Sequence, residues 1–179
     1  LMDIAAPSSA APIDTSKFRD PRETAKGEAR ASVSLNALNT LWINTGTLCN
    51  LTCVNCYIES SPTNDRLVYI TTDEVGAYLD EITAKDLETE EIGYTGGEPF
   101  VNPYMIDILD LTLSRGFRAL VLTNAMRPMA KVQDDLLNLR KKYGDQLVLR
   151  LSVDHYDRAH HEKERGPRSW KPTIDGLKW

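Results

Sequence analysis

Three cysteines, Cys49, Cys53 and Cys56, lie within a stretch of eight residues. A compact loop with this C-x3-C-x2-C spacing can turn three thiolates toward one point, and thiolates are soft ligands that suit iron–sulfur clusters or zinc. A structural zinc site normally has four protein ligands, and the chain contains no fourth cysteine. Three cysteines on a [4Fe-4S] cluster would leave one iron open to a substrate or cofactor. The spacing therefore predicts a metal centre with an open position.

Two other interpretations of the cysteines stay open. They could be small core residues, or two of them could form a redox pair while the third stays free. They could also form a zinc site completed by one of the histidines His155, His160 and His161. Charged neighbours place these histidines in a solvated helix or loop, so we do not expect them to bind a metal. An odd number of clustered cysteines is poor material for disulfides and indicates a reducing compartment.

A second segment of interest is Gly96-Gly97-Glu98-Pro99, which follows an expected strand. Paired glycines permit positive φ angles and bring bare backbone close to a ligand, while the glutamate offers an acceptor for a cation. By itself the segment is more typical of a tight turn with a solvated glutamate.

Polar residues also follow two later strands. Asn124 and Ser152 come where apolar runs end, and polar side chains at the mouth of a barrel can hydrogen-bond a ribose or carboxylate. The alternative for both is a helix cap or a turn residue.

The elements that must position these residues alternate from residue 40 onward. We expect strands over residues 40–45, 91–95, 118–122 and 147–153. We expect helices that begin at the capping box of Thr71 and Glu74, at Asn102 as N-cap, over residues 131–143 and at Ser169, the last one carrying Trp170, Ile174 and Leu177. Four βα units in residues 40–179 agree with roughly 30 residues per unit in barrels. Active sites of such folds lie at the carboxyl ends of the strands, where the cysteine loop falls.

The composition fits one globular domain, with 179 residues, of which 41% are apolar and 26% charged. A net charge of −5 provides no footprint for nucleic acid or an anionic membrane. No apolar run approaches the ~20 residues of a membrane span, and no secretory signal is visible. We therefore expect a cytoplasmic protein with a flexible leader over residues 1–38, rich in Ala, Pro and Ser, and one domain over residues 39–179.

Together, the cysteine loop and the G-G-E-P segment resemble the radical S-adenosylmethionine (SAM) superfamily. The resemblance implies an α/β fold, a partial parallel (β/α)6 barrel, with a [4Fe-4S] cluster on Cys49, Cys53 and Cys56. It implies reductive cleavage of SAM to a 5′-deoxyadenosyl radical that abstracts hydrogen from a small-molecule or peptide substrate. It also implies a reducing electron donor of the flavodoxin or ferredoxin type. A non-catalytic iron–sulfur or zinc module, and a barrel enzyme with inert cysteines, are the rival interpretations.

The same resemblance implies contacts with SAM. Gly96, Gly97 and Glu98 would meet its methionine ammonium, so Gly97→Val should suppress the response to SAM while the cluster still assembles. Ser152 and then Asn124 are the candidates for the ribose, and Arg165 for the SAM carboxylate. The residue before the third cysteine, often an aromatic adenine contact in the family, is Asn55 in this chain.

The expected strand over residues 147–153 is apolar enough to lie inside a sheet, yet no further strand follows it. The family's barrel needs two more βα units, roughly 60 residues. We therefore expect the chain to be truncated after about four units and to belong to a longer protein.

Overall fold

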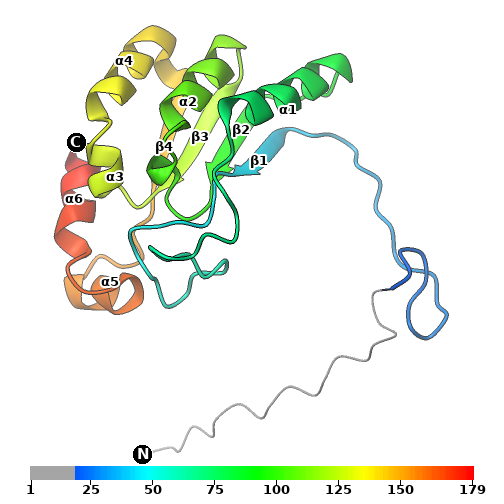
Figure 1. Ribbon diagram of the computed structural model, residues 1–179, viewed down its shortest axis with the longest axis horizontal. Coiled ribbons are helices and arrows are strands. Elements are labelled where there is room, and N and C mark those ends of the chain that lie inside the picture. The colour runs from blue at the N-terminus through cyan, green and yellow to red at the C-terminus, as the bar shows by residue number, and fades with distance from the viewer. Residues whose placement is uncertain (1–18) are drawn as a thin grey trace, which may run out of the picture. The chain divides into compact units, whose positions relative to one another are not determined.

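The computed structural model describes residues 19–179 (Figure 1). The described residues up to Asn36 and those from Ala37 to Trp179 form two compact units, and each is described by itself. Within the first unit, Glu23 and Ala29 pair in an isolated antiparallel bridge. Part of the predicted leader, residues 1–18, lies outside the described residues, and the flexibility of the whole segment stays a prediction.

The second unit is built on a four-stranded sheet with the order β1-β2-β3-β4, in which all neighbouring strands are parallel. The strands are β1 Thr40–Asn44, β2 Glu91–Thr95, β3 Arg118–Thr123 and β4 Leu147–Leu151. All four predicted strands are confirmed, with ends that differ by at most two residues. Because the strands are parallel, all four carboxyl ends lie along one edge of the sheet.

Helices α1, α2 and α4 cover one face of the sheet (Figure 1). The helices are α1 Thr72–Ala84, α2 Met105–Ser114, α3 Arg127–Ala130, α4 Gln133–Tyr143, α5 Arg158–Arg165 and α6 Trp170–Lys178, with 3-10 turns η1 Pro99–Val101 and η2 Gly144–Gln146. The predicted capping box of α1 is confirmed, since Thr71 Oγ1 accepts from Glu74 N and the Glu74 carboxylate accepts from Thr71 N. Among the described residues, no helix is long and apolar enough to cross a membrane.

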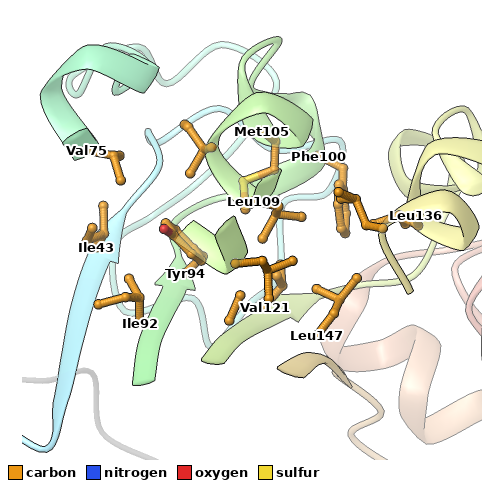
Figure 2. Packing of buried hydrophobic residues seen from close by; sticks show 14 of the residues in the cluster. Ile43, Val75, Ile92, Tyr94, Phe100, Met105, Leu109, Val121, Leu136 and Leu147 are labelled. Atoms are coloured by element: carbon orange, nitrogen blue, oxygen red, sulfur yellow. The ribbon is translucent and has the colours of Figure 1, made fainter. Parts of the chain in front are cut away.

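The hydrophobic core lies between the sheet and these helices (Figure 2). Alternate strand residues point toward the helices, as the two-residue period of a strand requires. The side chains in contact there are Ile43, Ile92, Tyr94, Val121 and Leu147 from the sheet and Val75, Met105, Leu109 and Leu136 from α1, α2 and α4. Burying one large apolar side chain contributes about 1.5–3 kcal/mol, so this core fixes the strands that carry the site.

One expectation for the helices is wrong. Asn102 does not directly precede α2, which begins at Met105; its Oδ1 accepts from Tyr104 N at 2.8 Å, and its amide Nδ2 donates to Thr45 O and Ile70 O, at 3.1 and 2.9 Å. The helix expected over residues 131–143 is confirmed as α4, which begins two residues later than expected; the short helix α3 lies before this range.

Helix α6 follows Ser169 and carries Trp170, Ile174 and Leu177, as expected. Thr173 is its fully buried side chain, whereas Leu177 is 55% exposed. The most deeply buried side chain of α6 is therefore polar, which the apolar residues of the helix did not indicate.

Candidate functional site

A cavity of about 230 Å³ opens at the carboxyl ends of the strands. It is formed by the cysteine loop after β1 and by residues that follow β2, β3 and β4, together with one residue of α5. The predicted site residues that line it are Cys49, Cys53, Cys56, Asn55, Gly96, Gly97, Asn124, Ser152 and Arg165. Parallel strands thus bring together segments that lie far apart in the sequence. Glu98 is not among the described residues that line the cavity.

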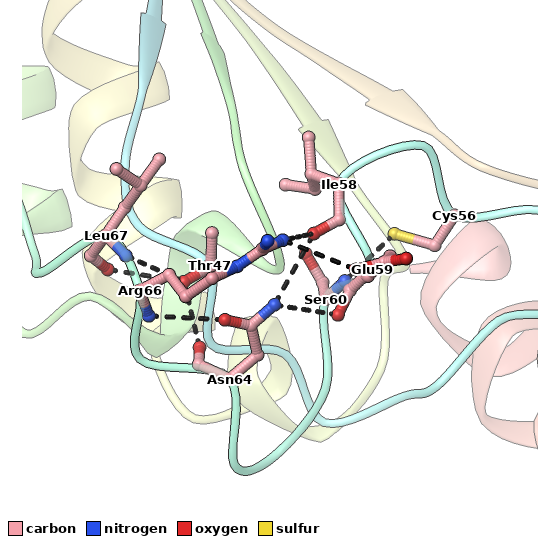
Figure 3. A network of polar contacts seen from close by, with 8 residues as sticks. All are labelled: Thr47, Cys56, Ile58, Glu59, Ser60, Asn64, Arg66 and Leu67. Atoms are coloured by element: carbon pink, nitrogen blue, oxygen red, sulfur yellow. Dashed lines mark hydrogen bonds and ion pairs between the residues drawn. The ribbon is translucent and has the colours of Figure 1, made fainter. Parts of the chain in front are cut away.

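The cysteines lie in a long irregular segment between β1 and α1, which side-chain hydrogen bonds hold in place (Figure 3). Thr47 Oγ1 donates to Asn64 O at 2.9 Å and accepts from Leu67 N at 3.1 Å. The Asn64 amide donates to Glu59 O at 2.8 Å. Such bonds replace those of a helix or strand, so the loop can present three sulfur atoms to one space.

Two of the sulfur atoms accept hydrogen bonds from backbone N–H groups. Leu51 N lies 3.4 Å from Cys49 Sγ, and Ser60 N lies 3.3 Å from Cys56 Sγ. Burial raises the pKa of the Cys49 thiol to about 11, and the bond from Leu51 opposes this; burial also raises the pKa of Cys53. A metal must therefore displace protons from these thiols, which its positive charge makes possible.

The donor set fits a cluster with three protein ligands. Three soft sulfur donors line one cavity, and among the described residues no histidine lines it to complete a zinc site. A closed structural zinc site needs four ligands, whereas a [4Fe-4S] cluster can be held by three cysteines with one iron open.

The two glycines of the G-G-E-P segment allow β2 to approach the cysteine loop. Gly97 N donates to Gly46 O at 2.8 Å, so the pairing of the two chain segments continues past the strands. A Cβ atom on Gly97 would lie 2.1 Å from Leu48 O, next to Cys49. Gly96 has a φ of +142°, and a Cβ atom there would lie 2.6 Å from Gly46 O. A side chain on Gly97 would therefore meet the cysteine loop, and Gly97→Val is no longer expected to spare the cluster.

The Glu98 carboxylate connects the ends of β2 and β3. The side chain is only 2% exposed. Its Oε1 accepts from Thr123 Oγ1 at 2.7 Å and from Phe100 N at 3.3 Å, and its Oε2 accepts from Asn124 N at 2.8 Å. Three donors within the protein thus hold the carboxylate, and its Oε2 atom, with one donor, can accept another hydrogen bond. The carboxylate joins the ends of β2 and β3, and its binding of the SAM ammonium stays a prediction.

We expect the stability of the metal-free protein to depend on the protonation of Glu98. Burial raises its pKa from the ordinary 4.5 to about 7, and hydrogen bonds from Asn124, Thr123 and Phe100 oppose the rise. Between these two values the folded state binds more protons than the unfolded state, so the free energy of unfolding should fall as the pH rises through this window. The full difference is on the order of 3 kcal/mol.

Urea denaturation of the wild type and of Glu98→Gln between about pH 5 and pH 8 measures this effect. The variant should lose the downward slope, because its amide does not titrate. Equal slopes in the two proteins would contradict the assignment.

Asn124 is fixed from several directions at the end of β3. Its side-chain Nδ2 donates to Asn50 Oδ1 at 2.9 Å and lies 3.9 Å from Cys49 Sγ. Its carbonyl accepts from the buried hydroxyl of Thr173 at 3.2 Å, so α6 supports the turn from behind. The next residue, Ala125, has a φ of +58°, a conformation that costs free energy and persists only where surrounding contacts impose it. Sequence reasoning missed this role of α6, since Thr173 lies far along the chain.

Helix α5 forms another wall of the site. Arg165 Nε lies 2.6 Å from Asp154 Oδ2, and both residues line the cavity. The carbonyl of Glu164 accepts from Val54 N at 2.8 Å, inside the cysteine loop. The sequence showed this segment as polar, and only the tertiary contacts reveal that it holds the loop.

The histidines differ in their surroundings. His161 is completely buried against Trp170, with ring centroids 5.3 Å apart, so the expectation that it is solvated is wrong. Burial lowers its pKa, and the charge of Arg165 lowers it further. His155, Asp157 and His160 offer ligand atoms within 4.8 Å of one another, but their hydrogen bonds cap α5, since Asp157 Oδ1 accepts from His160 N at 3.1 Å. That they bind no metal stays a prediction.

The comparison with family models gives one match, over residues 43–179, to the model described as the Radical SAM superfamily. The chain belongs to this superfamily. Radical SAM proteins use a [4Fe-4S] cluster and SAM, and the three cysteines and the G-G-E-P segment all lie within the matched residues. The resemblance stated from the sequence is thereby confirmed.

Similar proteins of the radical SAM superfamily include one curated relative and one solved fold. The chain is 32% identical over 131 residues to the antilisterial bacteriocin subtilosin biosynthesis protein AlbA of Bacillus subtilis (strain 168). The matched segment covers 73% of this chain and 28% of AlbA. The structure of Streptococcus suis SuiB bound to S-adenosylmethionine matches with a TM-score of 0.63 at 18% identity, over 78% of this chain and 30% of SuiB. The structure of SuiB bound to the precursor peptide SuiA matches with a TM-score of 0.65 at 18% identity, over 80% of this chain and 30% of SuiB.

The likeness to SuiB confirms the predicted α/β fold with a parallel sheet. The chain spans less than a third of the length of these relatives.

Proposed function

We propose that the protein is a radical SAM enzyme in which Cys49, Cys53 and Cys56 hold the [4Fe-4S] cluster. The observation that carries this proposal is that all three sulfur-bearing residues line one cavity at the carboxyl ends of parallel strands, beside Gly96 and Gly97. When bound, the cluster supplies the electron that cleaves SAM into methionine and a 5′-deoxyadenosyl radical, which abstracts hydrogen from the substrate.

The residues of the chain bind and orient the reactants. Gly96 and Gly97 bring bare backbone to the cavity, and Asn124 and Ser152, which follow β3 and β4, offer polar groups to the same cavity. The Arg165 guanidinium lines the same space and is suited to a carboxylate. We assign these residues, with Asn55, to the binding of SAM.

A peptide is the substrate class that we favour. AlbA is named for the biosynthesis of a bacteriocin, and SuiB binds the precursor peptide SuiA. The aromatic side chain of Tyr57, which lines the cavity, is 79% exposed, which suits contact with a peptide. A small reducing protein of the flavodoxin or ferredoxin type would supply electrons.

The test is anaerobic reconstitution with iron and sulfide, followed by electron paramagnetic resonance of the reduced protein with and without SAM. We expect one cluster of four irons and a spectrum that changes when SAM is added, because SAM binds the open iron. Stoichiometric zinc without iron-dependent absorbance would contradict the proposal. A cluster whose spectrum does not change on addition of SAM, and which does not cleave SAM, would favour the non-catalytic module.

A further inference from the structure

Ser60 carries a hydroxyl group for which the protein offers no partner. The residue is 3% exposed, and its Oγ atom is buried without a hydrogen bond to any described residue. Leaving a buried polar group unsatisfied costs about 1–3 kcal/mol, so such groups are rare unless something absent from the polypeptide contacts them. Ser60 lines the cavity that contains the three cysteines.

The backbone around Ser60 is held in an unfavourable conformation. Glu59 has a φ of +54°, which is uncommon for a residue with a side chain. Its N–H donates to Cys56 O at 3.0 Å, and its carbonyl accepts from the Asn64 amide at 2.8 Å (Figure 3). This turn directs the N–H of Ser60 to Cys56 Sγ at 3.3 Å. The strained turn and its supports thus place Ser60 directly beside a cluster ligand.

We propose that the Ser60 hydroxyl donates a hydrogen bond to a sulfur atom of the cluster that Cys56 helps to hold. The proposal rests on the proposed function, since it needs the cluster. The hydroxyl bonds to no sulfur atom of the described residues, so its partner would be a sulfur atom that the bound group brings. Hydrogen bonds to the sulfur atoms of a cluster stabilise its reduced form and raise its reduction potential.

The test measures the reduction potential of the reconstituted cluster in Ser60→Ala without SAM. The potential should shift to a more negative value, while the thermal stability of the metal-free protein stays equal or rises, because the substitution removes an unsatisfied atom. The matched control is Thr89→Val. Thr89 also has a buried hydroxyl without a partner among the described residues, but it precedes β2 at the opposite end of the sheet, and its loss should leave the potential unchanged.

An unchanged potential in Ser60→Ala, or the same shift in Thr89→Val, would overturn the inference. So would a variant whose potential is unchanged while its affinity for SAM falls, because the hydroxyl would then contact SAM. Ser60→Ala protein that loads no cluster although its metal-free form melts like the wild type would support the contact. A wild type that binds no four-iron cluster would instead refute the proposed function, which separates the two failures.

Discussion

Replacing any one of Cys49, Cys53 and Cys56 by alanine is expected to abolish assembly of the four-iron cluster. Three thiolates give no redundancy, and within the described residues the cavity offers no histidine that could substitute. Each variant should lose the iron-dependent absorbance and the resonance signal of the reduced protein completely rather than partially. Iron and sulfide analysis after anaerobic reconstitution measures the loss.

Val54→Ala is the matched control for the cysteine variants. Val54 lies in the same loop, its side chain is 81% exposed, and its contact with Glu164 uses the backbone N–H, which the substitution keeps. The control should load a normal cluster. Full iron content in any single cysteine variant would show that the cysteine concerned is not a ligand and that the three-ligand site is wrong.

The sequence predicted the parts of the site that depend on local pattern. Strands and the capping box of Thr71 follow from side-chain period and hydrogen bonding between near neighbours, so they could be located within about two residues. The position of the cysteine loop followed from the rule that parallel strands present their carboxyl ends together. These inferences need no knowledge of how distant segments pack.

The sequence could not show contacts that depend on distant partners. Glu98 was predicted as an acceptor for a cation, which stays a prediction, and its carboxylate also accepts from Thr123 Oγ1 and Asn124 N at the end of β3. Thr173 carried no signal, because its hydroxyl acts on a carbonyl 49 residues earlier. His161 has charged sequence neighbours and is nevertheless buried, since only one side of α5 faces solvent. No local pattern could have found these contacts.

The second large effect is expected for Gly97→Ala, which should prevent cluster assembly without removing any ligand. A Cβ atom at this position would lie 2.1 Å from Leu48 O and 2.9 Å from Thr47 O, both of them backbone atoms that cannot rotate away. The segment before Cys49 must therefore move, and its pairing with β2 through Gly46 O and Leu48 O must break. Overpacking of this kind costs about 1–3 kcal/mol or more.

Gly76→Ala separates this local displacement from the general effect of changing a glycine. Gly76 lies inside α1, and a Cβ atom there would make only an ordinary contact of 3.6 Å with Leu111 Cδ2. This variant should load a normal cluster and gain about 0.5–1 kcal/mol of stability, because alanine favours the helix. Iron content and urea denaturation of both variants decide the matter. If Gly97→Ala assembled a full cluster with an unchanged midpoint of unfolding, β2 would not press on the cysteine loop, and the glycine would be required only for the approach of SAM, as the sequence alone suggested.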